Sequence, residues 1–373
     1  MNLILIKPFN MGVRGLHRFL RIICNKYNTE AFQEKIFDDY QNKTMVVDVS
    51  QKIYSYGISI RNENGEDKMS FDGKIVNHLY AIIYYTKFLL EHSITPIYVF
   101  DGKTPLVKKD LLYERKERKL FAHQKCDEID DITSDDYIKY FKRSYSFSDV
   151  QSKECQQLLE AFGIPYVESL GEADPQCAAI ATFDEDIYGV ISEDIDTLVF
   201  GAKRICKDFS GKHAYVTELN LENILNVLLM ESNNIRKEKY KQPFDKFSYY
   251  NFVDFVSLLN TDYFFGLKFM SVFDIFNLFV LNNCDVYEMI SYIKKNHTEY
   301  IIDDEFIQKW DNVKKYFTET QIKNPLLINK YCKKPNKYKI IKILQNCKLK
   351  KHFIEEIIDI FNENYMKNKK DDY

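Results

Sequence analysis

The sequence predicts an α/β fold with a mainly parallel central sheet flanked by helices. Short apolar runs alternate with longer amphipathic segments over residues 11–107 and again over 151–216. This alternation is typical of parallel sheets with helices on both faces. Several of the apolar runs end in an acidic residue. The 373 residues are 45% hydrophobic, which is enough for one large core or two smaller ones.

The segment 11–107 is expected to supply the first two strands. Residues 11–26 have the spacing of an amphipathic helix, and 44–50 contain a short apolar run that predicts a buried strand. Residues 70–92 carry apolar side chains every three or four positions, which predicts a long helix. The next strand is expected in 96–105, where a glycine and a proline end it.

The segment 108–150 interrupts this alternation. It begins with a basic stretch, 108–119, and continues with an acidic one, 127–137, so we expect helices that lie outside the sheet. The alternation then resumes. In chain order it predicts a helix, a strand, a helix and two further strands, at 145–162, 164–169, 171–182, 188–196 and 204–209.

From about residue 217 the pattern is mostly helical, with a polar insertion at 231–246. We therefore divide the chain into six segments. They are an N-terminal extension or mis-assigned start (1–10), the first part of the core (11–107), a helical insertion (108–150), the second part of the core (151–216), a helical region (217–362) and a flexible tail (363–373).

Seven carboxylates occur at predicted element boundaries. They are Asp48, Asp101, Glu172, Asp174, Asp194, Asp196 and Asp262. The carboxyl ends of parallel strands are where open α/β sheets bind their ligands, and a helix start also favours negative groups. So much negative charge in one place needs a cation, and Mg²⁺ prefers oxygen ligands. A solvated strand end explains a single acid equally well, but the whole set favours a metal site.

The number of acids indicates two metal ions. Residues two apart in a strand point to the same face, so Asp194 and Asp196 are expected to share one ion. Seven carboxylates are too many for one Mg²⁺, which keeps several waters, and they suit two ions roughly 3.5–4 Å apart. This arrangement predicts metal-assisted hydrolysis of phosphate esters, with Mn²⁺ as an alternative ion.

Six motifs together resemble the flap endonuclease and XPG family of structure-specific 5′ nucleases. In the family's order they are MGVRGL (11–16), VVDVSQKIY (46–54), YVFDGKTP (98–105), GIPYVESLGEADPQCAA (163–179), SEDIDTLVFG (192–201) and LLNTDY (258–263). The stretch 335–361 is similar to the family's closing helical segment. The resemblance implies that 108–150 form a helical arch or gateway and that 217–362 form a helical DNA-binding region. The resemblance implies a PIN-like core and a Mg²⁺-dependent endonuclease with 5′ flap or 5′–3′ exonuclease activity, in DNA replication, repair or recombination.

The resemblance also implies how the acids are divided between the ions. One ion would be held by Asp48, Asp101, Glu172 and Asp174. The other would be held by Asp194 and Asp196, with Asp262 near it and partly linked through water.

The resemblance also implies roles for several basic and aromatic residues. Lys108 and Arg115 match the family's phosphate-handling lysine and arginine, and they are seven residues apart, on one helix face. They would stabilise negative charge at the scissile phosphate. Residues expected to contact DNA are Tyr54, by stacking on a base, Arg118, Lys119, Gly12 and Arg14. The alternative for Tyr54 is a tyrosine buried in the core. The alternative for 108–119 is a solvent-exposed helix in which acidic residues alternate with the basic ones.

The chain departs from the family pattern at three places. Ten residues precede the Met-Gly start, so either Met11 is the true start or the leader is retained and crowds the site. Asn260 replaces a family glycine, and only Gly266 is left of a glycine-rich turn that grips duplex DNA. We expect the run 333–351, with eight lysines and no acid, to bind phosphates and to compensate, a solvated face being the alternative. No sliding-clamp peptide of the Q-x-x-[LI]-x-x-[FY][FY] type is present near the C-terminus.

The composition of the chain narrows the classes of protein to which it can belong. The formal net charge of −3 does not itself indicate a nucleic-acid binder, although an acidic metal site masks local basic regions. The cysteines and histidines form no zinc-ligand spacing, and no apolar stretch is long enough to span a membrane. We expect a monomer that binds branched or flapped DNA, without a membrane partner. It would act in the nucleus, in a host nucleus if the chain is viral, or at a cytoplasmic site of DNA replication.

Two rival functions remain open. The first is a catalytically silent DNA-binding scaffold of the same fold, although none of the seven acids is missing. The second is an RNA 5′–3′ exonuclease, which needs contacts to the 2′-hydroxyl that the sequence does not identify.

Overall fold

The computed structural model describes residues 13–60, 67–103, 109–131, 134–145, 147–211, 213–267 and 270–370, without the side chains of 58, 109–115 and 368–370. These residues form two compact units. Unit 1 comprises the described residues up to Glu34 together with Glu193–Ile205 and Thr217–Thr320. Unit 2 comprises Lys35–Ser192, Cys206–Val216 and the chain from Gln321 onward.

A parallel sheet forms the centre of unit 2. Its strands lie in the order β5 (Ile187–Ile191), β2 (Thr44–Asp48), β3 (Thr95–Phe100) and β4 (Tyr166–Glu168). All three pairings between these neighbours are parallel. The predicted α/β class is therefore confirmed, and the carboxyl ends of these strands meet at one edge.

Three further strands have residues in both units. They are β1 (Phe32–Lys35), β6 (Arg204–Lys207) and β7 (Val216–Asn220), and β7 pairs with β1 and with β6. The strand predicted over 204–209 is thus present as β6. The mostly helical region that we expected from residue 217 instead begins with β7.

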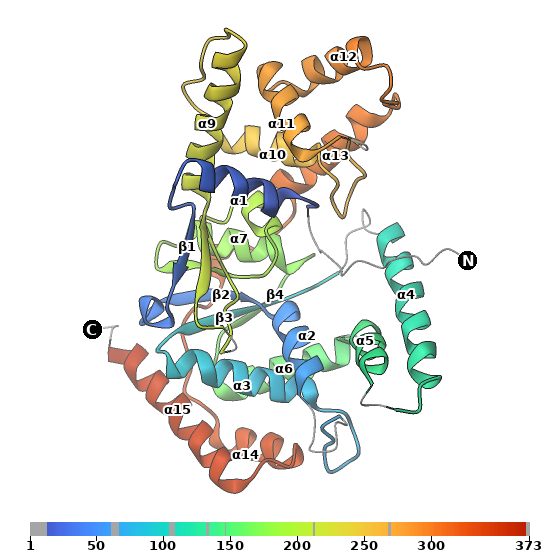
Figure 1. The fold of residues 1–373 in the computed structure, drawn as a ribbon. Coiled ribbons are helices and arrows are strands. Elements are labelled where there is room, and N and C mark those ends of the chain that lie inside the picture. The colour runs from blue at the N-terminus through green and yellow to red at the C-terminus, as the bar shows by residue number, and fades with distance from the viewer. Residues whose placement is uncertain are drawn as a thin grey trace. The chain divides into compact units, whose positions relative to one another are not determined.

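Unit 2 also contains helices (Figure 1). They are η1 (Phe37–Tyr40), α2 (Val49–Ser59), α3 (Asn77–Glu91), α4 (Lys109–Asp127), α5 (Asp135–Ser144), α6 (Asp149–Phe162), α7 (Ala173–Phe183), η3 (Pro325–Leu327), α14 (Lys337–Asn346) and α15 (Lys351–Lys370). Helix α15 lies beside α3, and the rings of Phe162 and Phe361 stack with centroids 4.1 Å apart. The end of the described chain therefore completes the core of unit 2.

This arrangement corrects two sequence predictions. The region 217–362 is not one helical body, because α14 and α15 belong to unit 2 while the helices before them belong to unit 1. Helix α15 also includes residues 363–370, which were predicted as part of a flexible tail.

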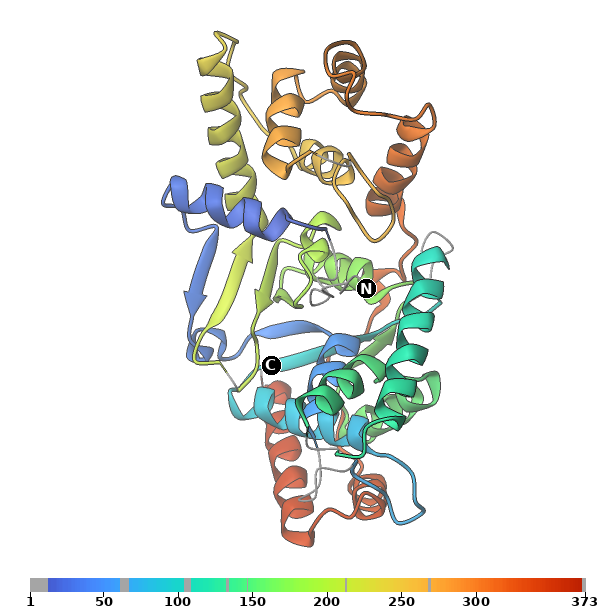
Figure 2. The ribbon, with the colours of Figure 1, turned by 45° about the vertical axis from the view of Figure 1, so that its right-hand side comes forward.

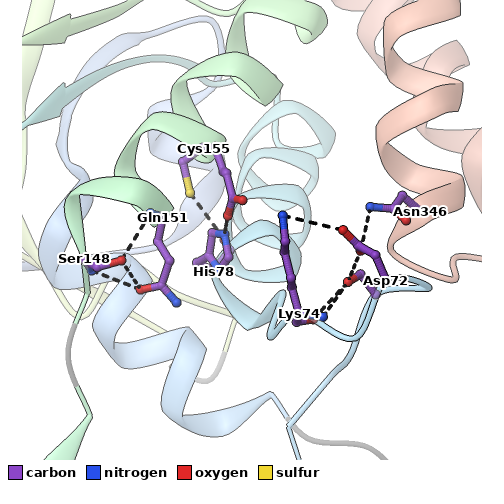
Figure 3. Close-up of polar contacts among 9 residues, drawn as sticks. Asp72, Lys74, His78, Ser148, Gln151, Cys155 and Asn346 are labelled. Atoms are coloured by element: carbon purple, nitrogen blue, oxygen red, sulfur yellow. Dashed lines mark hydrogen bonds and ion pairs between the residues drawn. The ribbon is translucent and has the colours of Figure 1, made fainter.

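Helix α3 begins at Asn77, seven residues later than predicted. The reason is a tight turn in which the Ser70 hydroxyl accepts a hydrogen bond from the Lys74 N–H and donates one to Asp72. Asp72 in turn accepts from Asn346 of α14 (Figure 3). A polar turn of this kind competes with helix formation even where the apolar spacing is helical.

Helices α4 and α5 pack against each other and lie outside the sheet (Figure 2). Ala122 and Cys126 are buried in this pairing, and Ser134 caps α5 through a hydrogen bond from the Tyr137 N–H. The prediction of helices outside the sheet in this segment is confirmed.

Unit 1 is mostly helical. Its helices are α1 (Leu16–Lys26), α8 (Asp196–Val199), α9 (Leu221–Glu238), α10 (Tyr249–Ser257), α11 (Val272–Leu281), α12 (Val286–Asn296) and α13 (Phe306–Glu319). Helix α9 continues through half of the stretch predicted as a polar insertion, 231–246. Among the described residues, no helix combines the length and the apolar character needed to cross a membrane.

Candidate active site

Four of the predicted metal ligands lie in unit 2, and three of them are close to the start of helix α7. Glu172 is the N-cap of α7, and Asp174 lies in its first turn. The backbone N–H of Ala173, between these two acids, donates a 2.8 Å hydrogen bond to Oδ1 of Asp101. The structure therefore brings together two acids of α7 and the acid that follows strand β3. Positive potential at a helix N-terminus stabilises such a group of carboxylates.

Asp48 reaches the same region from the neighbouring strand. It ends β2, is only 3% exposed, and caps α2 by accepting a hydrogen bond of 3.1 Å from the Ser50 N–H. Strands β2 and β3 are parallel, with Asp48 opposite Val99, two residues before Asp101. Adjacent parallel strands thus place both aspartates at one edge of the sheet, as the sequence predicted.

The thiol of Cys177 lies close enough to three of these acids to feel their charge. Cys177 lies on α7 and is fully buried. Burial raises the pKa of its thiol well above the ordinary value, and the negative charges of Asp48, Asp174 and Asp101 raise it further. Three carboxylates from β2, α7 and the end of β3 therefore act on one buried atom. Their combined field is the kind that a hard divalent cation neutralises.

Asp194 and Asp196 lie in unit 1, but not in a strand. Strand β5 ends at Ile191, and Asp196 is the first residue of the short helix α8. Oδ1 of Asp194 accepts a 3.0 Å hydrogen bond from the Asp196 N–H. The prediction that the two acids share a strand face is therefore wrong, because β5 ends at Ile191 and the hydrogen bond to the Asp194 side chain stabilises a turn instead. They remain neighbours through this turn.

A short segment at the start of the described chain links Asp196 to the loop that carries Asp262. The backbone N–H of Val13 donates to Oδ1 of Asp196 at 3.0 Å, and the N–H of Arg14 donates to the Asn260 carbonyl at 2.9 Å. Asp196 is only 4% exposed. Asp262 follows Asn260 by two residues, so all three predicted acids of unit 1 lie on segments joined by Val13 and Arg14.

Gly266 closes the loop after Asp262. A Cβ at this position would lie 2.1 Å from the Leu258 carbonyl oxygen and 2.4 Å from that of Leu259. The N–H of Leu267 donates to the same Leu258 carbonyl. Close backbone packing therefore requires the glycine here, independently of any phosphate-binding role.

The residues present fit Mg²⁺ in donor type, since every predicted ligand offers carboxylate oxygen. Within the described residues, however, no three His, Cys, Asp or Glu side chains form a ready group for a metal ion. Mg²⁺ is commonly bound by one or two protein carboxylates, with water and substrate phosphate completing its shell. The assignment of individual acids to the two ions stays a prediction.

Several predicted DNA-contacting residues lie partly outside the described structure. Gly12 and Lys108 are outside the described residues, as is the side chain of Arg115. Arg118 and Lys119 are exposed on α4. Their proposed contacts with the scissile phosphate and the displaced strand stay predictions.

Tyr54 is neither a core tyrosine nor a fully exposed ring. Its side chain is 39% exposed, its hydroxyl donates to the Lys142 carbonyl at 2.6 Å, and its ring meets that of Tyr145 edge to face. Burial raises the pKa of the Tyr54 hydroxyl. The ring thus connects α2, which begins after Asp48, to the end of α5, and part of it stays accessible for stacking.

The sequence did not reveal a cavity of about 980 Å³ in unit 2. Its lining includes Ser70, Phe71 and Lys74 before α3, Glu154 of α6, and Lys342 and Lys348 near α14. Lysines from the basic run 333–351 therefore border a hollow that three distant segments form. No local spacing in the sequence marks such a feature.

Comparisons with known proteins agree with this geometry. The family model of the XPG N-terminal domain matches residues 11–122, and that of the XPG I-region matches residues 163–262. Flap endonuclease 1 of Candida tropicalis is 27% identical over 327 residues, which are 87% of this chain and 82% of that protein. Flap endonuclease 1 of Meyerozyma guilliermondii is 32% identical over 254 residues, 68% of this chain and 63% of that protein.

Solved structures show the same fold. The flap endonuclease-1 of Methanococcus jannaschii has a TM-score of 0.64 at 24% identity, covering 90% of this chain and 96% of that one. The catalytic core of Rad2 in complex with a DNA substrate has a TM-score of 0.64 at 22% identity, covering 93% and 100% of the two chains.

Proposed function

The chain belongs to the flap endonuclease and XPG family of structure-specific nucleases, and from this we propose that it hydrolyses phosphodiester bonds in branched DNA, with 5′ flap or 5′–3′ exonuclease activity. The observation that carries the proposal is the group of acids around α7. Asp48 ends the strand beside the one that leads to Asp101, and the Ala173 N–H at the start of α7 donates to Asp101. Converging carboxylates at the strand ends are what metal-assisted phosphate chemistry requires.

We assign the acids of unit 2 to one metal ion and those of unit 1 to a second. This assignment follows the division that the family resemblance implies. Two bound Mg²⁺ ions would lower the pKa of the attacking water and stabilise the charge of the phosphate in the transition state. The protein's own part is to hold its carboxylates in place before DNA arrives. The Ser50 N–H does this for Asp48, and the Val13 N–H does it for Asp196, because each donates a hydrogen bond to a carboxylate oxygen.

Helices α4 and α5 are assigned to the single-stranded flap. Arg118 and Lys119 are exposed on α4, and Lys108 and Arg115 precede them on the same basic stretch. Fixed positive charge near a scissile phosphate stabilises negative charge that develops during cleavage. The base-stacking role of Tyr54 fits the exposed part of its ring.

The basic run 333–351 is assigned to the duplex backbone. All eight of its lysines are exposed. Only Lys339, with Glu160, and Lys351, with Glu355, take part in ion pairs within the described part of the chain. The other lysines are available to phosphates, and this contact is independent of base sequence. We also propose that the protein acts as a monomer, in the nucleus or at another site of DNA replication.

A panel of labelled substrates tests the function. It contains 5′ flaps, nicks, bubbles and four-way junctions in DNA, and a matched RNA flap. Each is incubated with Mg²⁺, with Mn²⁺ and with EDTA. We expect cleavage of the DNA flap with a divalent ion and none with EDTA. Binding of flaps without cleavage under every condition would identify a silent scaffold, and cleavage of RNA alone would identify an RNA exonuclease.

A further inference from the structure

A buried amide clasp holds helix α7 to a distant part of the chain. Residues 321–336, which we call the C-terminal strap, cross unit 2 before α14. Gln176 of α7 donates from Nε2 to the Lys323 carbonyl at 3.0 Å and accepts from the Lys323 N–H at Oε1, at 2.7 Å. Gln176 is fully buried. Its side-chain amide therefore binds both backbone polar groups of one strap residue, Lys323.

The strap also holds the other end of α7. Nζ of Lys330 lies 2.7 Å from Oδ2 of Asp184, the C-cap of α7, and 2.7 Å from Oδ2 of Asp186. Partial burial opposes the charge of Lys330, but hydrogen bonds from the two carboxylates outweigh it and raise the pKa of the amine. The contact thus persists as an ion pair over the whole neutral range.

A third contact fixes the strap to α6. The Lys333 N–H donates to the Gly163 carbonyl at 2.7 Å, and the Asn336 N–H donates to the Ala161 carbonyl at 2.8 Å. Gly163 has φ +74°, and a Cβ there would lie 2.0 Å from the Lys333 carbonyl oxygen. The strap therefore lies directly on the backbone of α6 and cannot shift without breaking these bonds.

We infer that Gln176 is a positioning residue for the proposed metal site, because its clasp to the strap fixes the rotation and height of α7. Asp174 lies two residues before Gln176, and Glu172 lies four before it, at the N-cap. A small rotation of α7 would therefore displace both carboxylates together. Groups that orient metal ligands typically contribute about 10- to 100-fold to metal affinity or activity. This inference rests on the proposed function.

The test compares Gln176→Leu with Gln156→Leu on α6, which lies outside the clasp. Leucine keeps much of the volume but offers no polar atom. Lys323 is exposed, so water can replace the lost hydrogen bonds of the strap and the variant is expected to fold. Mn²⁺ binding to the DNA-free protein is measured by electron paramagnetic resonance. We expect a dissociation constant raised by about 10-fold or more for Gln176→Leu and unchanged for Gln156→Leu.

The outcomes separate this inference from the proposed function. If the wild type neither binds Mn²⁺ nor cuts flaps, the nuclease assignment fails. If the wild type does both and Gln176→Leu binds Mn²⁺ as the wild type does, the clasp has no positioning role. If Gln176→Leu does not fold, amide hydrogen exchange of the wild type, with and without Mg²⁺, tests whether the clasp is coupled to the metal site. Mg²⁺ must then slow exchange at the Lys323 N–H as well as at the first turn of α7, because coupling between sites is reciprocal. Slowing confined to α7 overturns the inference.

Discussion

The backbone N–H of Val13 donates a 3.0 Å hydrogen bond to Oδ1 of Asp196 across 183 positions of sequence. The bond gives Asp196 two separable properties. Its oxygen anchors the segment that leads into α1, and its charge is the part that a metal ion uses. A side-chain amide can accept the same hydrogen bond without the charge.

Asp196→Asn is therefore expected to keep the fold and to abolish cleavage. Loss of one carboxylate charge should lower the rate on a 5′ flap by more than about 100-fold. The rate is measured under single-turnover conditions with Mg²⁺, and the melting temperature reports folding. Asp245→Asn, at an exposed position of unit 1, is the matched control. Full activity of Asp196→Asn would remove Asp196 from the metal site.

Two substitutions at Tyr54 should differ in effect. Tyr54→Phe removes only the hydroxyl that donates to the Lys142 carbonyl, and it keeps the accessible ring. Tyr54→Ala removes the ring, and base stacking is worth about 1–3 kcal/mol. We expect kcat/KM on the flap to fall roughly 5- to 100-fold for alanine and much less for phenylalanine. Equal losses would show that the hydroxyl contact with α5, not stacking, is what matters.

The basic run should account for part of the salt dependence of DNA binding. Lys337→Gln combined with Lys342→Gln is expected to weaken duplex binding. It should also reduce the slope of log K against log salt by about 0.9 for each phosphate that the protein no longer neutralises. Binding is followed by fluorescence anisotropy over a range of salt concentrations. Lys339→Gln is the control, since Glu160 already pairs with that lysine. A slope that stays the same in the double variant argues for a solvated face.

Acid should destabilise the protein partly through His78. His78 is fully buried, with Nε2 2.7 Å from Oε2 of Glu154 (Figure 3). Burial lowers the pKa of His78, and hydrogen bonding and charge from Glu154 oppose this without overcoming it. The unfolded chain therefore takes up the proton more readily. Stability is complete above the ordinary pKa of about 6.5 and is lost as the pH falls towards the lowered value.

Urea unfolding between about pH 7 and pH 5 measures this effect. The midpoint of the wild type should fall more steeply with acid than that of His78→Gln, which has no imidazole to protonate. His123→Gln, exposed on α4, should behave as the wild type. Parallel curves for the wild type and His78→Gln would contradict the assignment.

The strands and most of the acids could be predicted because their signals are local. Apolar runs ending in Asp48 and Asp101 specify buried strands, and parallel pairing then places both acids at one edge. The turn at Asp194 was missed because an apolar run followed by alternating acids resembles a continuing strand. There the hydrogen bond from the Asp196 N–H to the Asp194 side chain stabilises a turn instead.

Pairings between distant segments could not be read from spacing at all. The clasp joins Gln176 to Lys323, 147 residues away, and nothing near either residue marks the pairing. The division of the C-terminal helices between two units has the same origin. Their apolar faces show that each helix packs, but not which partner it packs against.

The stacking of Phe361 on Phe162 means that the core of unit 2 can be completed only near the end of protein synthesis. At roughly 5–20 residues per second, a ribosome needs about 10–40 s to travel from one ring to the other. Throughout that interval the core of unit 2 lacks α15, and the strap that binds α7 is made only in its later part. We expect newly made chains to acquire an ordered α7, with the acids at its start in place, only late in translation.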